Sequence, residues 1–133
     1  MKKKISVLLN NKIKKFNRKI FVEADKSISH RSLLIASQCI GVSKIKNILE
    51  SEDVKNTIIC LTKLGVKIVK KKNEFFVYGN GLGSFRKPKN NSLYAGNSGT
   101  LARMLLGLLA TQPNLKIKIL GDDSLNKRDM KRI

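Results

Sequence analysis

The sequence has no tryptophan, and only 5% of its 133 residues are aromatic. A hydrophobic core therefore has to be built mainly from isoleucine, leucine and valine. Because 41% of the residues are apolar, the chain is nevertheless globular rather than disordered. Its length is enough for one ordinary domain with a real core, and for no more than that.

Long apolar runs are also missing. The N-terminus, MKKKISVLLNN, resembles a secretory signal in its lysines, but its apolar stretch covers only residues 5–9. A secretory signal needs about 7–15 apolar residues and a membrane-spanning helix roughly 18, so the sequence predicts neither. We therefore expect a cytoplasmic location and no membrane partner.

Cysteine is too sparse to form a disulfide framework. The two cysteines, Cys39 and Cys60, lie among apolar residues in helical patterns, with no CxxC pair and no histidines close by. Both are expected to be free, buried thiols, and no metal site is expected.

Acidic residues are few. The chain has 9 aspartates and glutamates against 28 lysines and arginines, which gives a formal net charge of +19. Such an excess suggests a polyanionic partner, a phosphorylated substrate or a compositional bias of the whole proteome. The lysines are spread along the whole chain among many asparagines and isoleucines, which favours a compositional bias of the proteome over the other two explanations. Residues 1–20 are denser, with eight basic residues and no acidic one, and would attract nucleic acid or anionic lipid if exposed.

Hydrophobic periodicity and turn residues predict alternating strands and helices. Strands are expected at residues 19–25, 43–49, 66–69, 74–79, 92–96 and 115–120, with a loop at 79–91. Helices are expected after the first strand up to Gly41, from Glu52 or Asp53 to Gly65, and over 98–111. The final stretch, SLNKRDMKRI, is interpreted as the start of another helix, containing Arg128 and Met130.

This order of elements recurs along the chain. At an offset of 72 residues, six of 26 aligned positions are identical, and they fall at matching places in matching elements. Arg31 aligns with Arg103, and Asp25 aligns with Asn97 just before each helix. We interpret the pattern as two copies of one unit, the second incomplete. An incomplete unit leaves a sheet edge and apolar helix faces uncovered, so the chain looks like the front part of something larger.

Both repeated helices begin with groups that suit an anion. The first turn of a helix has free backbone N–H groups and the positive end of the helix dipole. The first copy adds Lys26, Ser27 and Arg31, and the second adds Asn97 and a glycine, Gly99, that allows close approach to the backbone. Two such helix ends suggest a substrate with more than one anionic group, although the same residue types also cap ordinary helices for stability alone.

At these residues the sequence resembles a known enzyme family. The stretches DKSISHR, EDVKNTIICLTKLGVKI, GNSGTLARMLLGLLA and GDDSLNKRDM occur in this order. Together they are similar to the N-terminal part of 5-enolpyruvylshikimate-3-phosphate (EPSP) synthase, from about residue 20 to the end. The resemblance implies an α/β protein with the enolpyruvyl transferase fold: two globular halves built from βαβαββ repeat units, with helices inside and sheets outside.

On this resemblance the chain holds about one and a half units of one half. Residues 1–22 would be the N-terminal segment of the first half, whose remainder is absent. Residues 23–133 would be a partial second half, with repeat units 23–80 and 91–133. The basic arm at 1–20 would then be a strand-forming piece without its sheet. We expect an incomplete N-terminal fragment that is inactive alone, because the family's remaining acid-base and phosphate-binding groups come from later in a longer chain.

The resemblance also implies an activity. The family transfers the enolpyruvyl group of phosphoenolpyruvate to the 5-hydroxyl of 3-phosphoshikimate, a step of the shikimate pathway to aromatic amino acids, with no metal and no cofactor. By motif, Lys26 would be catalytic and would contact both substrates. The residues that would hold 3-phosphoshikimate are Lys26, Ser27 and Arg31. Those on the phosphoenolpyruvate side would be Lys26, Asn97, Gly99 and Arg128. The full-length enzyme is expected to be monomeric, without a nucleic-acid partner.

Two basic residues near these motifs get other roles. The resemblance makes Arg103 structural, buried near the site, and we expect His30 to be a surface residue without a catalytic role.

The sequence also departs from the family pattern. Glu23 and Ala24 stand where Pro-Gly is usual, and Asp129 replaces a proline. Gly99 is kept where glyphosate-tolerant members carry alanine, which predicts sensitivity in a complete enzyme.

Two alternatives remain open. The related UDP-N-acetylglucosamine enolpyruvyl transferase has Lys-Asn at the first motif and a catalytic cysteine in a later loop, whereas this chain has Ser27 and DDSLNK. A basic nucleic-acid-binding module is the other alternative. Against it, the sequence has no aromatic stacking pattern, no zinc-finger spacing and no recognition helix.

Overall fold

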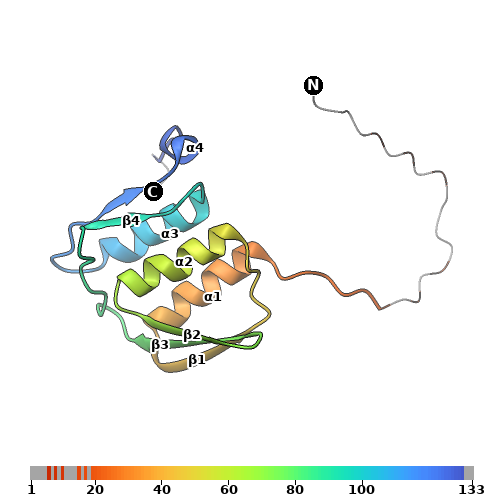
Figure 1. The fold of residues 1–133 in the computed structure, drawn as a ribbon, viewed down its shortest axis with the longest axis horizontal. Coiled ribbons are helices and arrows are strands. Elements are labelled where there is room, and N and C mark those ends of the chain that lie inside the picture. The colour runs from red at the N-terminus through yellow and green to blue at the C-terminus, as the bar shows by residue number, and fades with distance from the viewer. Residues whose placement is uncertain are drawn as a thin grey trace.

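The computed structural model describes residues 6, 8, 10, 15, 17 and 19–130. It contains four helices and five strands in this part of the chain (Figure 1). The helices are α1 (Lys26–Gln38), α2 (Glu52–Lys63), α3 (Gly99–Ala110) and α4 (Asp123–Asn126). The strands are β1 (Ile40–Lys46), β2 (Lys67–Lys71), β3 (Glu74–Asn80), β4 (Ser92–Tyr94) and β5 (Lys118–Leu120).

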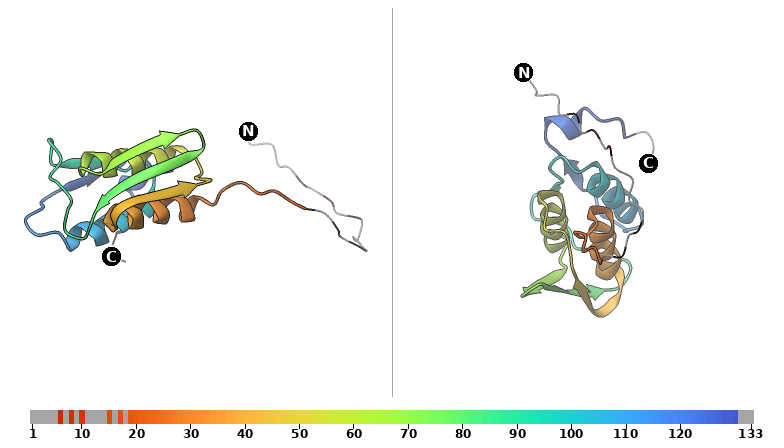
Figure 2. Two further views of the ribbon diagram at one scale, coloured as in Figure 1. Left: turned by 90° about the horizontal axis from the view of Figure 1, so that it is seen from below. Right: turned by 90° about the vertical axis from the view of Figure 1, so that its right-hand side faces the viewer.

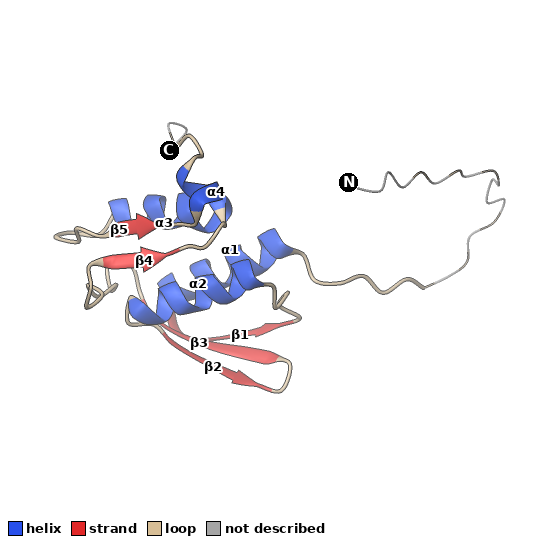
Figure 3. Ribbon diagram, turned by 45° about the horizontal axis from the view of Figure 1, so that its top comes forward, coloured by secondary structure: helices blue, strands red, loops and turns tan. Residues whose placement is uncertain are grey.

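The strands form two sheets with helices between them. One sheet is antiparallel with the order β1-β3-β2, and the other is the parallel pair β4-β5. Helices α1 and α2 lie between the antiparallel sheet and the β4-α3-β5 unit (Figures 2 and 3). The fully buried side chains at the centre are mainly aliphatic and include Leu33, Leu61, Leu64, Val77, Leu93, Leu101 and Leu105.

Strand β3 shows why the antiparallel sheet has one buried face. Its side chains alternate, so that Phe75 and Val77 are buried against the helices while Phe76 and Tyr78 are only partly buried on the other face. Gly79 lies on the buried face, where a Cβ atom would meet the backbone oxygens of Cys39 and Ala36. Glycine is therefore required for β3 to approach the end of α1.

The helices agree most closely with the sequence prediction. The second predicted helix, from Glu52 or Asp53 to Gly65, corresponds to α2, which begins at Glu52 and is followed by Gly65 at a φ of +93°. The hairpin of β2 and β3 and the irregular loop at 79–91 are also present. Helices α1 and α3 begin at residues 26 and 99, and α2 and α4 at 52 and 123, close to the offset of 72 found in the sequence.

Two predicted elements were wrong. Residues 19–25 form no strand, and Phe21 and Val22 are more than three-quarters exposed. A strand is stable only when a neighbouring strand takes up its hydrogen bonds, and no described strand pairs with this segment. Among the described residues, α1 is therefore not preceded by the opening strand of the expected βαβαββ order. The last helix, α4, ends at Asn126, so that Arg128 and Met130 follow it rather than lie within it.

Three burial predictions were also wrong. Cys60 is buried as expected, and burial raises the pKa of its thiol to about 11, but Cys39 is exposed at the end of α1. His30, expected at the surface, is fully buried, and Arg103, expected to be buried, is exposed. His30 and Arg103 lie on helices that the sequence predicted, but the packing of each helix decided which face is covered. Cys39 instead follows α1 in an extended conformation, outside the helix in which it was expected.

Most of the basic arm at 1–20 falls outside the described residues, as do residues 131–133. The expectation that residues 1–20 are a strand-forming piece therefore falls largely outside the described residues and stays a prediction. None of the helices in the described part of the chain has the length and apolar character needed to cross a membrane.

Candidate functional site

The first predicted anion site lies where α1 begins. The Asp25 carboxylate caps the helix by accepting a hydrogen bond of 2.7 Å from the Ile28 backbone N–H. The next residue, Lys26, places its Nζ 2.9 Å from Oδ2 of Asp53 in the first turn of α2. The Lys26 side chain is half exposed, so its ammonium group is oriented by α2 and still open to a ligand.

The other two predicted residues of this site lie on the same helix. Ser27 is partly buried in the first turn of α1, and Arg31 is exposed about one turn further on. Arg31 borders an apolar groove of about 680 Å³ between α1 and α3, which Arg103 also lines. The arginines aligned by the 72-residue repeat therefore face one groove.

Beneath Lys26, a buried histidine joins α1 to α2. The Nδ1 atom of His30 lies 2.6 Å from Oγ1 of Thr57, and both side chains are fully buried. Desolvation lowers the pKa of His30, with Lys26 acting in the same direction and Asp53 opposing it. The imidazole is therefore neutral at physiological pH.

The second predicted anion site lies where α3 begins, and it depends on glycine. Gly96 has a φ of +61°, and a Cβ atom there would lie 2.5 Å from Nδ2 of Asn56 on α2. The helix is capped by Ser98, whose Oγ accepts a hydrogen bond of 3.2 Å from the Leu101 N–H. Asn97, which the repeat aligns with the cap of α1, is exposed beside the capping residue.

Two guanidinium groups approach the first residue of α3. A Cβ atom on the buried Gly99 would lie 3.0 Å from Nη1 of Arg128 and 3.6 Å from Nη1 of Arg103. Arg103 also donates to the Asp129 carbonyl at 3.4 Å, and Arg128 donates to Oγ of Ser124 at 3.4 Å. An anion at this helix start would meet backbone N–H groups and two planar cations together.

Helix α2 connects the two predicted sites. Its first turn holds Lys26 through Asp53, and its second turn packs Asn56 against Gly96. The amino ends of α1, α2 and α3 point to the same side of the molecule (Figure 1). The arrangement therefore offers two cationic helix starts side by side, which can hold two anionic groups at once.

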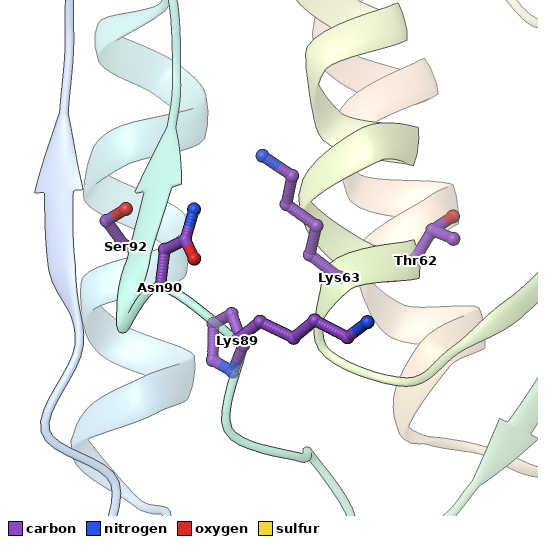
Figure 4. A pocket seen from close by; sticks show the side chains of 6 residues that line it. Thr62, Lys63, Lys89, Asn90 and Ser92 are labelled. Carbon is purple, nitrogen blue, oxygen red and sulfur yellow. The ribbon is translucent and has the colours of Figure 1, made fainter.

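Another basic pocket lies at the opposite end of α2. It has a volume of about 450 Å³ and is lined by Lys63 and Lys89, whose ammonium groups point in different directions (Figure 4). At 1.5 Å per residue, Lys63 is about 15 Å along the helix from Asp53. This pocket is therefore separate from the two helix starts.

Sequence reasoning missed the residues of α2 and the buried histidine. Asp53, Asn56 and Thr57 are three and four residues apart, so they share one face of the predicted helix. The signal available in the sequence was a row of polar residues on a helix that also has an apolar face. What this row contacts could not be read from the sequence, because its partners are 27 to 40 residues away along the chain.

Comparison with known proteins identifies the family. The family model described as EPSP synthase (3-phosphoshikimate 1-carboxyvinyltransferase) matches residues 10–133. The chain belongs to the EPSP synthase family. A 3-phosphoshikimate 1-carboxyvinyltransferase from Syntrophomonas wolfei is 45% identical over 125 residues, and one from Bacillus cytotoxicus is 45% identical over 120 residues. These matches cover 94% and 90% of this chain.

Solved structures show the same similarity in three dimensions. The EPSP synthase from Acinetobacter baumannii superposes with a TM-score of 0.75 at 36% sequence identity, over 85% of this chain and 26% of that one. The described helices and sheets therefore have the mixed α/β arrangement of this family. The chain spans 29% and 28% of the length of the Syntrophomonas and Bacillus relatives.

Proposed function

We propose that this chain contributes to a 3-phosphoshikimate 1-carboxyvinyltransferase, which transfers the enolpyruvyl group of phosphoenolpyruvate to the 5-hydroxyl of 3-phosphoshikimate. Membership of the family supports the reaction, and the two cationic helix starts joined by α2 support the site. Both substrates carry several negative charges, so that two basic sites at a short separation suit them better than one.

Each helix start has its own role in the proposed site. Lys26, Ser27 and Arg31 hold 3-phosphoshikimate at the start of α1. Asn97, Gly99 and Arg128 line the phosphoenolpyruvate side at the start of α3, and Lys26 acts on both substrates. The partly exposed Lys26 ammonium and the close approach of Arg128 to Gly99 support this division.

The chemistry explains why cations are needed. The 5-hydroxyl group loses its proton as its oxygen adds to C2 of phosphoenolpyruvate, and the methylene carbon of phosphoenolpyruvate takes up a proton, which gives a tetrahedral adduct. Loss of phosphate and of a proton from the new methyl group then restores the double bond. Charge develops beside a carboxylate and a phosphate in these steps, so that positioned cations lower the barrier. No metal or cofactor takes part in the proposed reaction.

The proposal extends to the organisation of the whole protein. Residues 23–80 and 91–133 are successive repeat units of one globular half, and residues 1–22 belong to the other. The matching starts of α1 and α3 and of α2 and α4 support the two units. The complete enzyme works as a cytoplasmic monomer, with no nucleic-acid partner and no membrane partner.

The proposal is tested by joining this chain to the remaining part of the Syntrophomonas wolfei relative. The joined protein should convert both substrates to 5-enolpyruvylshikimate 3-phosphate and phosphate, whereas the 133-residue chain alone should be inactive. In the joined protein, Lys26→Met should reduce kcat at least 10²-fold, because it removes a cation from the transition state. The matched control is Lys89→Met, a lysine of the separate pocket, which should leave kcat and KM unchanged. An inactive joined protein, or full activity in Lys26→Met, contradicts the proposal.

A further inference from the structure

His30 and Thr57 form an inner contact directly below the Lys26–Asp53 ion pair. His30 follows Lys26 by four residues on α1, and Thr57 follows Asp53 by four residues on α2, so each pair shares one helix face. The outer contact joins Lys26 Nζ to Asp53 Oδ2 at 2.9 Å. The inner contact joins His30 Nδ1 to Thr57 Oγ1 at 2.6 Å. Two successive turns of α1 and α2 are therefore held together by polar groups.

The direction of the hydrogen bonds follows from the Thr57 hydroxyl. This hydroxyl donates to the Asp53 carbonyl at 3.3 Å, and it has only one proton to give. With that proton assigned to the Asp53 carbonyl, Oγ1 accepts from Nδ1–H of a neutral His30. The Nε2 atom is then an unprotonated acceptor, and it is buried without a hydrogen-bond partner among the described residues.

An apolar side chain would pack this position at a lower cost. A buried nitrogen without a hydrogen-bond partner destabilises the folded chain, and leucine at this position would avoid that loss. The imidazole instead supplies a donor that fixes Thr57, and Thr57 in turn bonds to the backbone of the residue that holds Lys26. A continuous chain of contacts thus runs from the buried imidazole to the exposed ammonium group.

We propose that His30 is a positioning residue for Lys26: its neutral imidazole, acting through Thr57, holds the first turn of α2 where Asp53 can orient the Lys26 ammonium. The proposal rests on the function proposed above, in which Lys26 contacts both substrates. On this proposal, a buried residue that contacts no ligand determines the geometry of the site.

The proposal predicts that acid releases Lys26. A second proton on Nε2 would create a buried N–H without an acceptor and a charge close to Lys26. Among the described residues, Asp53 on α2 and Lys26 on α1 are the charged groups that act on this imidazole. The imidazolium would repel Lys26 and compete with it for Asp53. The ion pair should therefore loosen as the pH falls through the pKa of His30, which burial places below its ordinary value.

The decisive measurement is the exchange of the Lys26 ammonium protons with water, followed by NMR in the full 133-residue chain. Exchange is slow while Asp53 holds the ammonium group. It should become at least about tenfold faster in His30→Leu and in Thr57→Val. His30→Asn keeps a donor near the position of Nδ1 and cannot be protonated, so its exchange should stay slow. The ratio of the exchange rate in the unaltered chain to that in His30→Asn should rise as the pH falls. Thr57→Ser should behave as the unaltered chain does.

Kinetics of the joined enzyme give a second readout. His30→Leu should lower kcat and raise KM for 3-phosphoshikimate about tenfold each, while His30→Asn restores both within about threefold. The phosphate groups of the substrates titrate equally with either enzyme, so that the ratio of their pH profiles isolates His30.

The outcomes separate the two proposals. If the joined enzyme with His30 intact is inactive, the proposed function fails, and ammonium exchange still decides the role of His30. Unchanged exchange in both His30→Leu and Thr57→Val overturns the positioning role, as do coincident acid profiles for the unaltered chain and the His30→Asn variant. If His30→Leu does not fold, Thr57→Val decides alone, because it removes only the hydroxyl.

Discussion

The starts of α1 and α3 align with each other at an offset of about 72 residues but are built differently. At the offset of 72, Ala24 aligns with Gly96, Lys26 with Ser98, and Ser27 with Gly99. The α1 start has a charged cap and a cationic side chain of its own, which an ion pair orients. The α3 start has a neutral cap between two glycines, and its cations come from Arg103 and Arg128.

In the two proposed sites, one helix geometry receives its positive charge in two different ways. At α1 the positive charge is on Lys26, in the first turn of the helix, and Asp53 on the neighbouring helix α2 orients its ammonium group. At α3 the local residues provide space and backbone N–H groups, and the charge comes from further along the chain. Substitutions at aligned positions should therefore have unequal effects.

The largest difference in stability should be at the aligned pair Gly96 and Ala24. Gly96→Val forces a β-branched residue to a positive φ and a Cβ to 2.5 Å from Asn56 Nδ2. We expect the free energy of unfolding in urea to fall by about 2–4 kcal/mol. Ala24→Val should change it by less than about 0.5 kcal/mol, because Ala24 has no positive φ.

A second control measures the general effect of replacing a glycine by a residue with a Cβ atom. Gly107 lies exposed within α3, and a Cβ there would meet nothing within 4 Å. Gly107→Ala should therefore raise the free energy of unfolding by about 0.5–1 kcal/mol. A loss of under about 1 kcal/mol in Gly96→Val would contradict the glycine requirement at the α3 start.

The two helix caps should differ by a smaller amount. Ser98→Ala leaves the Leu101 N–H without a partner in a buried place, and should cost about 1–2 kcal/mol of unfolding free energy. Asp25→Ala should cost about 0.5–1 kcal/mol, because water can replace the exposed carboxylate. Only the Asp25→Ala effect should shrink in high salt, since its cap is charged. Equal costs, or salt dependence of both, would contradict this distinction.

The smallest effect on stability should come from Lys26. The ion pair to Asp53 is half exposed on the lysine side, so Lys26→Met should change the free energy of unfolding by only about 0.2–1 kcal/mol. The change should decrease between roughly 0.05 M and 1 M salt, as measured by urea unfolding. A loss above about 2 kcal/mol would mean that Lys26 serves mainly to hold α1 to α2.

The sequence predicted the helices better than the strands. Helix α2 was located to within two residues because its apolar spacing, acidic first turn and following glycine all act within a few residues. The strand expected at 19–25 has the right composition, yet no described strand pairs with it. The last helix was expected to include Arg128, but it ends two residues earlier.

The candidate site was predictable only in part. The cap at Asp25, the cation at Lys26 and the glycine at Gly99 all follow from rules about helix starts. The burial of His30 did not, because a single histidine on a helix with both polar and apolar neighbours has no periodic signal. The exposure of Arg103 was likewise decided by the groove between α1 and α3.

By itself the sequence determined the order of the helices, the places where they begin, and the kind of charge offered at each start. These depend on hydrogen bonds and side-chain preferences within about four residues of the chain. Only the tertiary structure decided that Asp53 orients Lys26, that Asn56 closes on Gly96 and that Arg128 reaches Gly99. Such contacts join residues 27 to 40 positions apart, and their distances are set by how α1, α2, α3 and the segment after α4 pack against one another.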